Sequence, residues 1–105
     1  MGKKAIVNQL TKFKTELNKD IPIDKMIFFG SRVKGKFHRD SDIDLIIVSP
    51  QFRLLNFFKR GAKMYDYWNL NYPVDFLCYT PTEFNKLKKQ ITIVREAIRE
   101  GIEIK

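Results

Sequence analysis

The chain has 105 residues, which is enough for one domain with a single hydrophobic core and too few for two. Its 44% hydrophobic and 13% aromatic content excludes a disordered chain and favours a folded globule. The net charge of +8 favours polyanionic partners such as nucleotides, nucleic acid or an acidic protein surface. Because the lysines are spread along the chain, the charge alone does not single out nucleic acid.

Several features concern the compartment. No apolar run approaches the ~20 residues that span a bilayer, and the first residues lack the apolar segment of a signal peptide. Ile6 stands where a myristoylation signal requires serine or threonine. Cys78 is the single cysteine, which excludes an internal disulfide. We therefore expect a cytoplasmic protein with a buried reduced thiol and no membrane attachment.

Apolar residues recur with helical or strand spacing along the chain, without repeats or low-complexity tracts. In chain order, the predicted elements are a helix at 4–17, a strand at 25–29, a helical turn at 31–36, a strand at 42–48, a helix at 54–68, a strand at 74–79, helices at 81–90 and 92–100, and a short edge strand at 102–105.

Two of these elements carry additional signals. The strand at 42–48 ends in a continuous apolar run, which is typical of a central strand covered on both faces. Thr80, Pro81 and Glu83 form the capping pattern of a helix start. We expect one α+β domain over residues 1–105, with a small mixed sheet and helices mostly on one side of it.

The segments 29–35 and 41–45 carry the chemistry. Gly30 ends a predicted strand, where a glycine lets backbone N–H groups approach a ligand closely and the following helix start favours an anion. Asp42 and Asp44 point to the same face of the next strand because side chains alternate along a strand. Two neighbouring carboxylates repel each other unless a cation lies between them. The pattern therefore indicates chemistry on a metal-bound nucleotide.

Asp75 is the one charged residue of the predicted strand at 74–79. A charge buried alone would cost several kcal/mol, so it needs a partner. One strand–helix–strand excursion after Asp44 would place Asp75 on a neighbouring strand, where it would complete a site of three carboxylates. Magnesium prefers such oxygen ligands, and two ions could hold the attacking and leaving oxygens of a nucleotidyl transfer.

This combination of a Gly-Ser turn, an Asp-x-Asp strand and a lone strand aspartate resembles the nucleotidyltransferase superfamily that includes DNA polymerase β. More narrowly, it is similar to the minimal nucleotidyltransferase (MNT) domains that pair with HEPN proteins as toxin–antitoxin systems. The resemblance covers nearly the whole chain and implies the polymerase β-like fold, ATP and magnesium, with two ions. It implies that Gly30 and Ser31 contact the nucleotide phosphates, that Asp42 and Asp44 bind the metal ions, and that Asp75 is both a ligand and the candidate base.

The basic residues beside the glycine turn admit two interpretations. Arg32, Lys34 and Lys36 either steady phosphate charge or form a solvated turn. The aromatic residues between positions 57 and 72 are too many for one core stripe. We expect most of them in the core and some on a docking surface for a partner.

Two other motifs fail on a required residue. Residues 30–36 fit a phosphate-binding P-loop, but Phe37 follows where the magnesium-binding serine or threonine is needed. Residues 40–44 imitate the start of a calcium-binding EF-hand loop, but Leu45 occupies the position that requires glycine. His38 has no second histidine with which to form a metal site, so we expect a surface residue.

The resemblance implies an enzyme that moves AMP from ATP to a hydroxyl, a tyrosine of a HEPN-type toxin, and so acts as an antitoxin. A partner that brings its own acceptor suits a chain too small for a deep two-substrate cleft. Two alternatives stay open. One is an antitoxin that neutralises its partner by binding alone, and the other is a nucleotidyltransferase subunit that acts on a small molecule or a nucleic-acid end.

Overall fold

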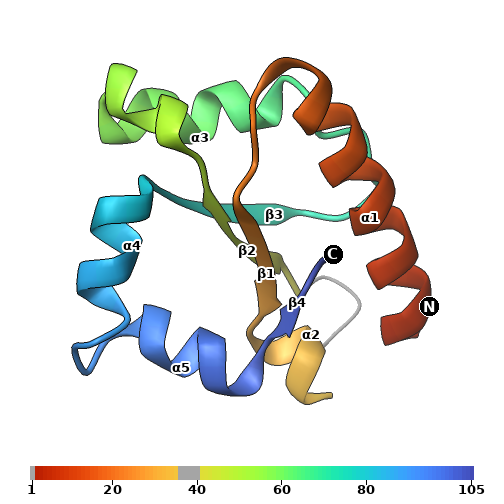
Figure 1. Ribbon diagram of the computed structural model, residues 1–105. Coiled ribbons are helices and arrows are strands. Elements are labelled where there is room, and N and C mark those ends of the chain that lie inside the picture. The colour runs from red at the N-terminus through yellow and green to blue at the C-terminus, as the bar shows by residue number, and fades with distance from the viewer. Residues whose placement is uncertain (1, 36–40) are drawn as a thin grey trace.

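The computed structural model describes residues 2–35 and 41–105, so Lys36, His38 and Asp40 lie outside the described residues. The elements follow one another as shown in Figure 1: α1 (Lys3–Asp20), β1 (Lys25–Phe29), α2 (Ser31–Lys34), β2 (Ile43–Val48), η1 (Pro50–Leu54), α3 (Phe57–Tyr65), β3 (Val74–Tyr79), α4 (Pro81–Leu87), α5 (Ile93–Glu100) and β4 (Ile102–Glu103). The expected strands at 25–29 and 74–79 are confirmed at the same residues.

The four strands form one mixed sheet in the order β3-β2-β1-β4. β1 pairs antiparallel with β2 and β4, whereas β2 and β3 run parallel. The connection from β2 to β3 contains η1 and α3, which is the strand–helix–strand excursion that the sequence predicts. β2 therefore lies inside the sheet, and its last four residues are buried, as its apolar run requires.

Helices cover both faces of this sheet, which contradicts the expectation that they lie mostly on one side. α1 and α3 pack on one face, through side chains such as Leu10 and Met64. α4 and α5 pack on the other face, through side chains such as Phe84 and Val94. In Figure 1, α1 and α3 occupy the right and top of the view, and α4 and α5 the left and bottom. The expectation was wrong because β2 has apolar side chains on both faces, and each face needs a cover.

Side-chain caps determine where the later helices begin. Thr80 and Glu83 form the predicted capping box at the start of α4. The expected single helix at 54–68 is instead divided into η1 and α3. The division arises because Asn56 accepts a hydrogen bond from the Lys59 N–H and caps a new helix at Phe57.

Arg60 of α3 is a buried charge that ties four elements together. Its guanidinium donates hydrogen bonds to the carbonyl oxygens of Phe52, Leu55 and Cys78, at 2.9, 3.1 and 3.2 Å. It also forms a two-point pair with the carboxylate of Glu83, at 2.7 and 3.3 Å. The hydrogen bond to Arg60 lowers the pKa of Glu83 below its ordinary value. One cation thus satisfies backbone carbonyls at the ends of η1 and β3 and anchors the start of α4.

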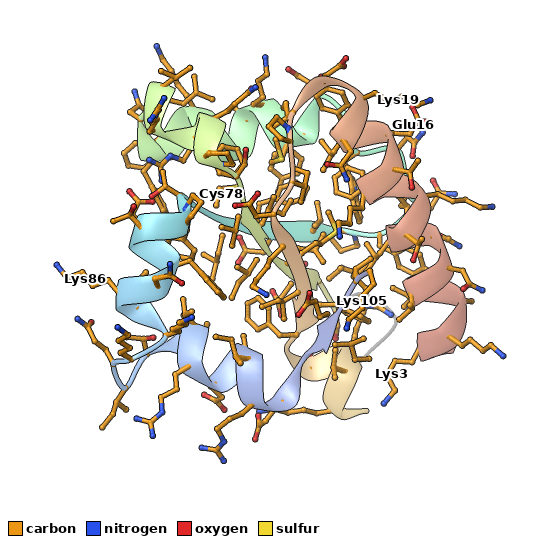
Figure 2. The ribbon with its side chains drawn as sticks, in the orientation of Figure 1. Lys3, Glu16, Lys19, Cys78, Lys86 and Lys105 are labelled. Carbon is orange, nitrogen blue, oxygen red and sulfur yellow. The ribbon has the colours of Figure 1, made fainter. Side chains whose placement is uncertain are left out.

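The cysteine and the surface side chains agree in part with expectation. Cys78 is buried, which confirms that part of the expectation. Burial also raises the pKa of its thiol to about 12. Figure 2 shows Lys19 and Lys86 pointing outward from opposite sides of the molecule, consistent with dispersed positive charge. None of the helices in the described ranges combines the length and apolarity needed to cross a membrane.

The aromatic residues are divided between the core and the surface. Trp68 is half-buried and packs edge-on against Phe13 and Phe76, with ring centroids 5.0 and 5.8 Å apart. Phe57 and Phe58 at the start of α3 are 52% and 87% exposed. The expectation that most of this group lies in the core is wrong, because Tyr65 is also 52% exposed and only Tyr67, Trp68 and Tyr72 pack, partly buried, against the core. The docking role of the exposed phenylalanines stays a prediction.

The Arg60 contacts predict a large loss of stability in Arg60→Met, which keeps the bulk of the side chain and removes its donors. We expect the free energy of unfolding to fall by about 2–4 kcal/mol, because three backbone carbonyls, two of them in buried hydrogen bonds, and Glu83 lose their partner. The exposed neighbour Arg53 provides the control, and Arg53→Met should change stability by less than about 0.5 kcal/mol. Urea unfolding at neutral pH measures both, and equal small changes would contradict the role given to Arg60.

Candidate functional site

The site begins at Gly30, between β1 and α2. Its backbone has φ of 91° and ψ of −162°, a conformation that is essentially restricted to glycine. A Cβ atom here would overlap the Oδ2 atom of Asp44 on the neighbouring strand β2. The carboxylate of Asp44 therefore lies directly against the Gly30 backbone, and the glycine is needed for both its conformation and the space it leaves.

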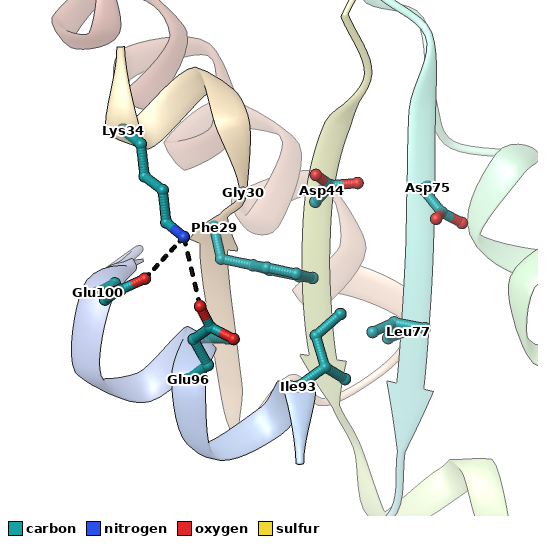
Figure 3. Close-up of a pocket in the computed structure, with 10 residues that line it drawn as sticks. Phe29, Gly30, Lys34, Asp44, Asp75, Leu77, Ile93, Glu96 and Glu100 are labelled. Carbon is teal, nitrogen blue, oxygen red and sulfur yellow. Dashed lines mark hydrogen bonds and ion pairs between the residues drawn. The ribbon is translucent and has the colours of Figure 1, made fainter. Parts of the chain in front are cut away.

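The parallel register of β2 and β3 places Asp44 directly opposite Asp75. Both residues line one pocket of about 270 Å³ between the sheet and α5, together with Gly30. Apolar side chains, including Leu77 and Ile93, also line this pocket. In Figure 3 the carboxyl group of Asp75 is directed away from Asp44, on the other side of the β3 ribbon.

Asp42 lies just before the first residue of β2 and is exposed, and it does not line this pocket. Its charge still acts on the site, because both Asp42 and Asp75 raise the pKa of Asp44. Within residues 2–35 and 41–105, no three acidic, histidine or cysteine side chains are grouped so that they could hold a metal ion. The structure thus brings Asp44 and Asp75 into one pocket with Asp42 at its edge, and does not form the expected cluster of three.

Burial, followed by the charges of Asp75 and Asp42, raises the pKa of Asp44 to about 6. The same two aspartates, after burial, raise the pKa of Tyr65 in α3. The charges of Asp42 and Asp75 therefore act on Asp44 although the three carboxylates do not converge on one point. This arrangement is the kind that a bound cation relieves, because a cation stabilises the charged form of each carboxylate.

The donor set fits magnesium in chemistry. Magnesium takes oxygen ligands, and it is usually bound through one or two carboxylates together with substrate phosphates and water, and seldom by a complete protein cage. Asp44 and Asp75 supply two carboxylates from adjacent strands. A nucleotide would supply the remaining oxygens.

Ser31, which the resemblance places at the nucleotide, and Arg32, which is a second candidate for the phosphates, have different surroundings. Ser31 is the first residue of α2 and is half-buried outside the pocket lining. Arg32 is buried, and its Nε atom donates a hydrogen bond to the Ser41 carbonyl oxygen at 2.8 Å. Its guanidinium lies over the ring of Tyr72, 5.0 Å from the centroid. In this structure Arg32 positions the chain that leads to Asp42, and its role at the phosphates stays a prediction.

The other wall of the pocket contains Lys34, for which the sequence allows a role at the phosphates, and two carboxylates to which the sequence reasoning gave no role. Lys34 of α2 is paired with two carboxylates of α5, those of Glu96 at 3.3 Å and Glu100 at 2.9 Å. These hydrogen bonds raise the pKa of Lys34 and lower that of Glu100. Ile93, Glu96 and Glu100 are spaced for one helix face, a signal that the sequence contains. The sequence does not reveal that this face looks onto Asp44.

The position of Gly30 predicts a specific loss in Gly30→Ala. The free energy of unfolding should fall by at least about 1 kcal/mol more than in Gly35→Ala, because the new methyl group overlaps Asp44 and the Gly30 backbone lies in a region essentially restricted to glycine. Gly35 provides the comparison, since its φ is also positive, at 78°, but its backbone is left-handed helical and its Cβ would meet nothing within 4 Å. Denaturant unfolding of the two variants measures the difference, and equal losses would refute the close contact.

The raised pKa of Asp44 predicts a pH-dependent stability. The unfolded chain ionises this carboxyl near 3.8 and the folded protein only near 6, so the folded state loses stability as the pH rises through this window. In Asp44→Asn this loss should disappear. We expect the wild-type protein to lose about 1 kcal/mol more than the variant, a figure discounted for solvent screening. Unfolding between about pH 4 and pH 7 with a chelator present measures it, and parallel profiles would contradict the shift.

The chain matches known proteins in sequence and in fold. The nucleotidyltransferase domain family matches residues 10–99. A Haemophilus influenzae protein named "Probable protein adenylyltransferase MntA" is 30% identical over 99 residues, which cover 90% of this chain and 85% of that protein.

Two solved structures are similar in fold. A crystal structure of a Sulfolobus solfataricus protein assigned as a nucleotidyltransferase has a TM-score of 0.64 at 22% identity, covering 98% of this chain and 87% of that one. A toxin-antitoxin structure with AMP-PNP has a TM-score of 0.51 at 21% identity, covering 94% and 72%. With the match over residues 10–99 and a 30% identical relative, the chain belongs to the nucleotidyltransferase domain family.

Proposed function

We propose that this nucleotidyltransferase moves AMP from ATP to a hydroxyl of a partner protein, with magnesium as its cofactor. The acceptor is a tyrosine of a HEPN-type toxin, and the modification makes the chain an antitoxin. The observation that carries the proposal is the pairing of Asp44 with Asp75 in a pocket that begins at Gly30. The similarity to a curated protein adenylyltransferase supports the reaction class, and the fold shared with a toxin-antitoxin structure supports the kind of partner.

The reaction exchanges one bond to phosphorus for another. The acceptor oxygen forms a bond to the α-phosphorus of ATP, and the bond from that phosphorus to the oxygen bridging the α- and β-phosphates breaks. Pyrophosphate leaves with the electron pair of the broken bond. The proton of the acceptor hydroxyl passes to Asp75, whose side chain is exposed and can meet an incoming acceptor.

The pocket's own charges support a dependence on divalent cations. Among the described residues that line it, four carboxylates face a single lysine. A bare triphosphate would be repelled by this lining, although the whole chain is positively charged. Magnesium held by Asp42, Asp44 and Asp75 would offset this repulsion and lower the pKa of the acceptor hydroxyl.

The Gly30 turn is the proposed contact to the phosphates, together with Ser31 and Arg32. Gly30 leaves its backbone open to a ligand because it has no side chain, and it holds Asp44 at the same place. Phosphate oxygens bound at this turn would lie beside the two strand carboxylates. The proposal therefore places the α-phosphate between the turn and the pair of Asp44 and Asp75.

The proposal predicts that Asp75→Asn abolishes transfer. With α-labelled ATP, magnesium and the protein encoded by the neighbouring reading frame, the label on that partner should fall by at least about 100-fold. Asp24→Asn is a matched control. Asp24 donates its backbone N–H to the Val48 carbonyl at the far end of β2 from the site, so this variant should retain wild-type transfer.

The other outcomes of this assay identify the alternatives. If no label appears and both forms still neutralise the partner, the chain is an antitoxin that acts by binding alone. Label on a nucleic-acid end or a small molecule identifies a different acceptor. Undiminished label on the partner with Asp75→Asn would overturn the role given to Asp75.

A further inference from the structure

Lys34 lines the pocket from α2 and pairs there with two carboxylates of α5. It belongs to α2, the helical turn that follows Gly30, and it lines the same pocket as Asp44 and Asp75. Its Nζ atom is held by Glu100 Oε2 at 2.9 Å and by Glu96 Oε1 at 3.3 Å (Figure 3). One cation of α2 is thus engaged by two carboxylates of α5, across the mouth of the site.

Its side chain remains accessible, with 46% of its surface exposed. Exposed ion pairs contribute little net stability, because water solvates the separated charges well. The packing of Val94 and Ala97 against the sheet holds α5 independently of these pairs. Lys34 can therefore exchange its carboxylate partners for another anion at small cost.

We propose that Glu96 and Glu100 compete with the nucleotide phosphates for the ammonium group of Lys34 and so set which nucleotides the pocket retains. This inference rests on the proposed function, because it takes the pocket to be the nucleotide site. A triphosphate carries enough negative charge to draw Lys34 from both carboxylates. A monophosphate carries less and displaces them poorly. The acidic pair on α5 thereby makes the site select triphosphate over AMP.

The proposal predicts that removing the lysine weakens nucleotide binding and that removing the two glutamates strengthens it. With magnesium, Lys34→Gln should weaken binding of α,β-methylene ATP by at least about 10-fold, because a charge-assisted hydrogen bond is lost. The double variant Glu96→Gln/Glu100→Gln should strengthen it by about 3-fold, because the competitors are removed. Calorimetry with this analogue measures binding without transfer, since its bond between the α- and β-phosphates resists cleavage.

Combining the changes separates competition from a general loss of negative charge. In a chain that already carries Lys34→Gln, the two glutamine substitutions should give no further gain, because the residue for which they compete is gone. The same gain in both backgrounds would overturn the proposal. Lys34→Arg should retain binding within about 3-fold, because the positive charge is kept.

Two further controls exclude a structural explanation. Glu103→Gln breaks the comparable exposed pair with Lys25, 3.7 Å long and outside this pocket, and should leave binding unchanged. Binding of AMP should change less than 3-fold with Lys34→Gln, whereas a distorted pocket would weaken the binding of AMP and of the triphosphate alike.

If the wild-type chain binds no magnesium–nucleotide, the proposed function fails. If it binds and Lys34→Gln has no effect, only this inference fails.

Discussion

The parallel pairing of β2 with β3 is the constraint on which the site depends. It places Asp44 and Asp75 opposite each other, and strand alternation turns both toward the face that α5 covers. A shift of one residue would turn one of the two carboxylates toward the core beneath α1 and α3. The buried apolar side chains on both faces of β2 resist such a shift. The core packing of the sheet is therefore also what keeps Asp44 and Asp75 in register.

Two buried arginines stabilise the two ends of this sheet. Arg32 binds the Ser41 carbonyl and lies over Tyr72, so it fixes the chain that enters β2 beside Asp42. Arg60 holds the ends of η1 and β3 and the start of α4, at the opposite end of the sheet. Both use guanidinium donors to satisfy backbone carbonyls, a geometry that lysine could not reproduce.

The charge of the pocket opposes the charge of the protein. The chain carries +8, yet four of the charged side chains that line the described pocket are carboxylates and one is a lysine. The overall field attracts nucleotides and acidic proteins from a distance, while the pocket itself repels an anion that arrives without cations. A site of this kind is suited to a nucleotide that binds together with a metal ion. Lys34 and its two glutamate partners are among the residues that line this pocket.

The sequence by itself determined the local elements and the adjacency of two of the three aspartates. The strands at 25–29 and 74–79, the capping box at Thr80 and the pairing of an Asp-x-Asp strand with Asp75 follow from alternation, capping and spacing over a few residues. The division of the helix at 54–68 was missed, because the Asn56 cap competes with helical periodicity. Only the tertiary structure decided which sheet face each helix covers, that Arg32 is buried against Ser41, and that Glu96 and Glu100 hold Lys34. Those outcomes depend on packing between segments far apart in the chain, and no local pattern encodes which of several compatible faces will meet.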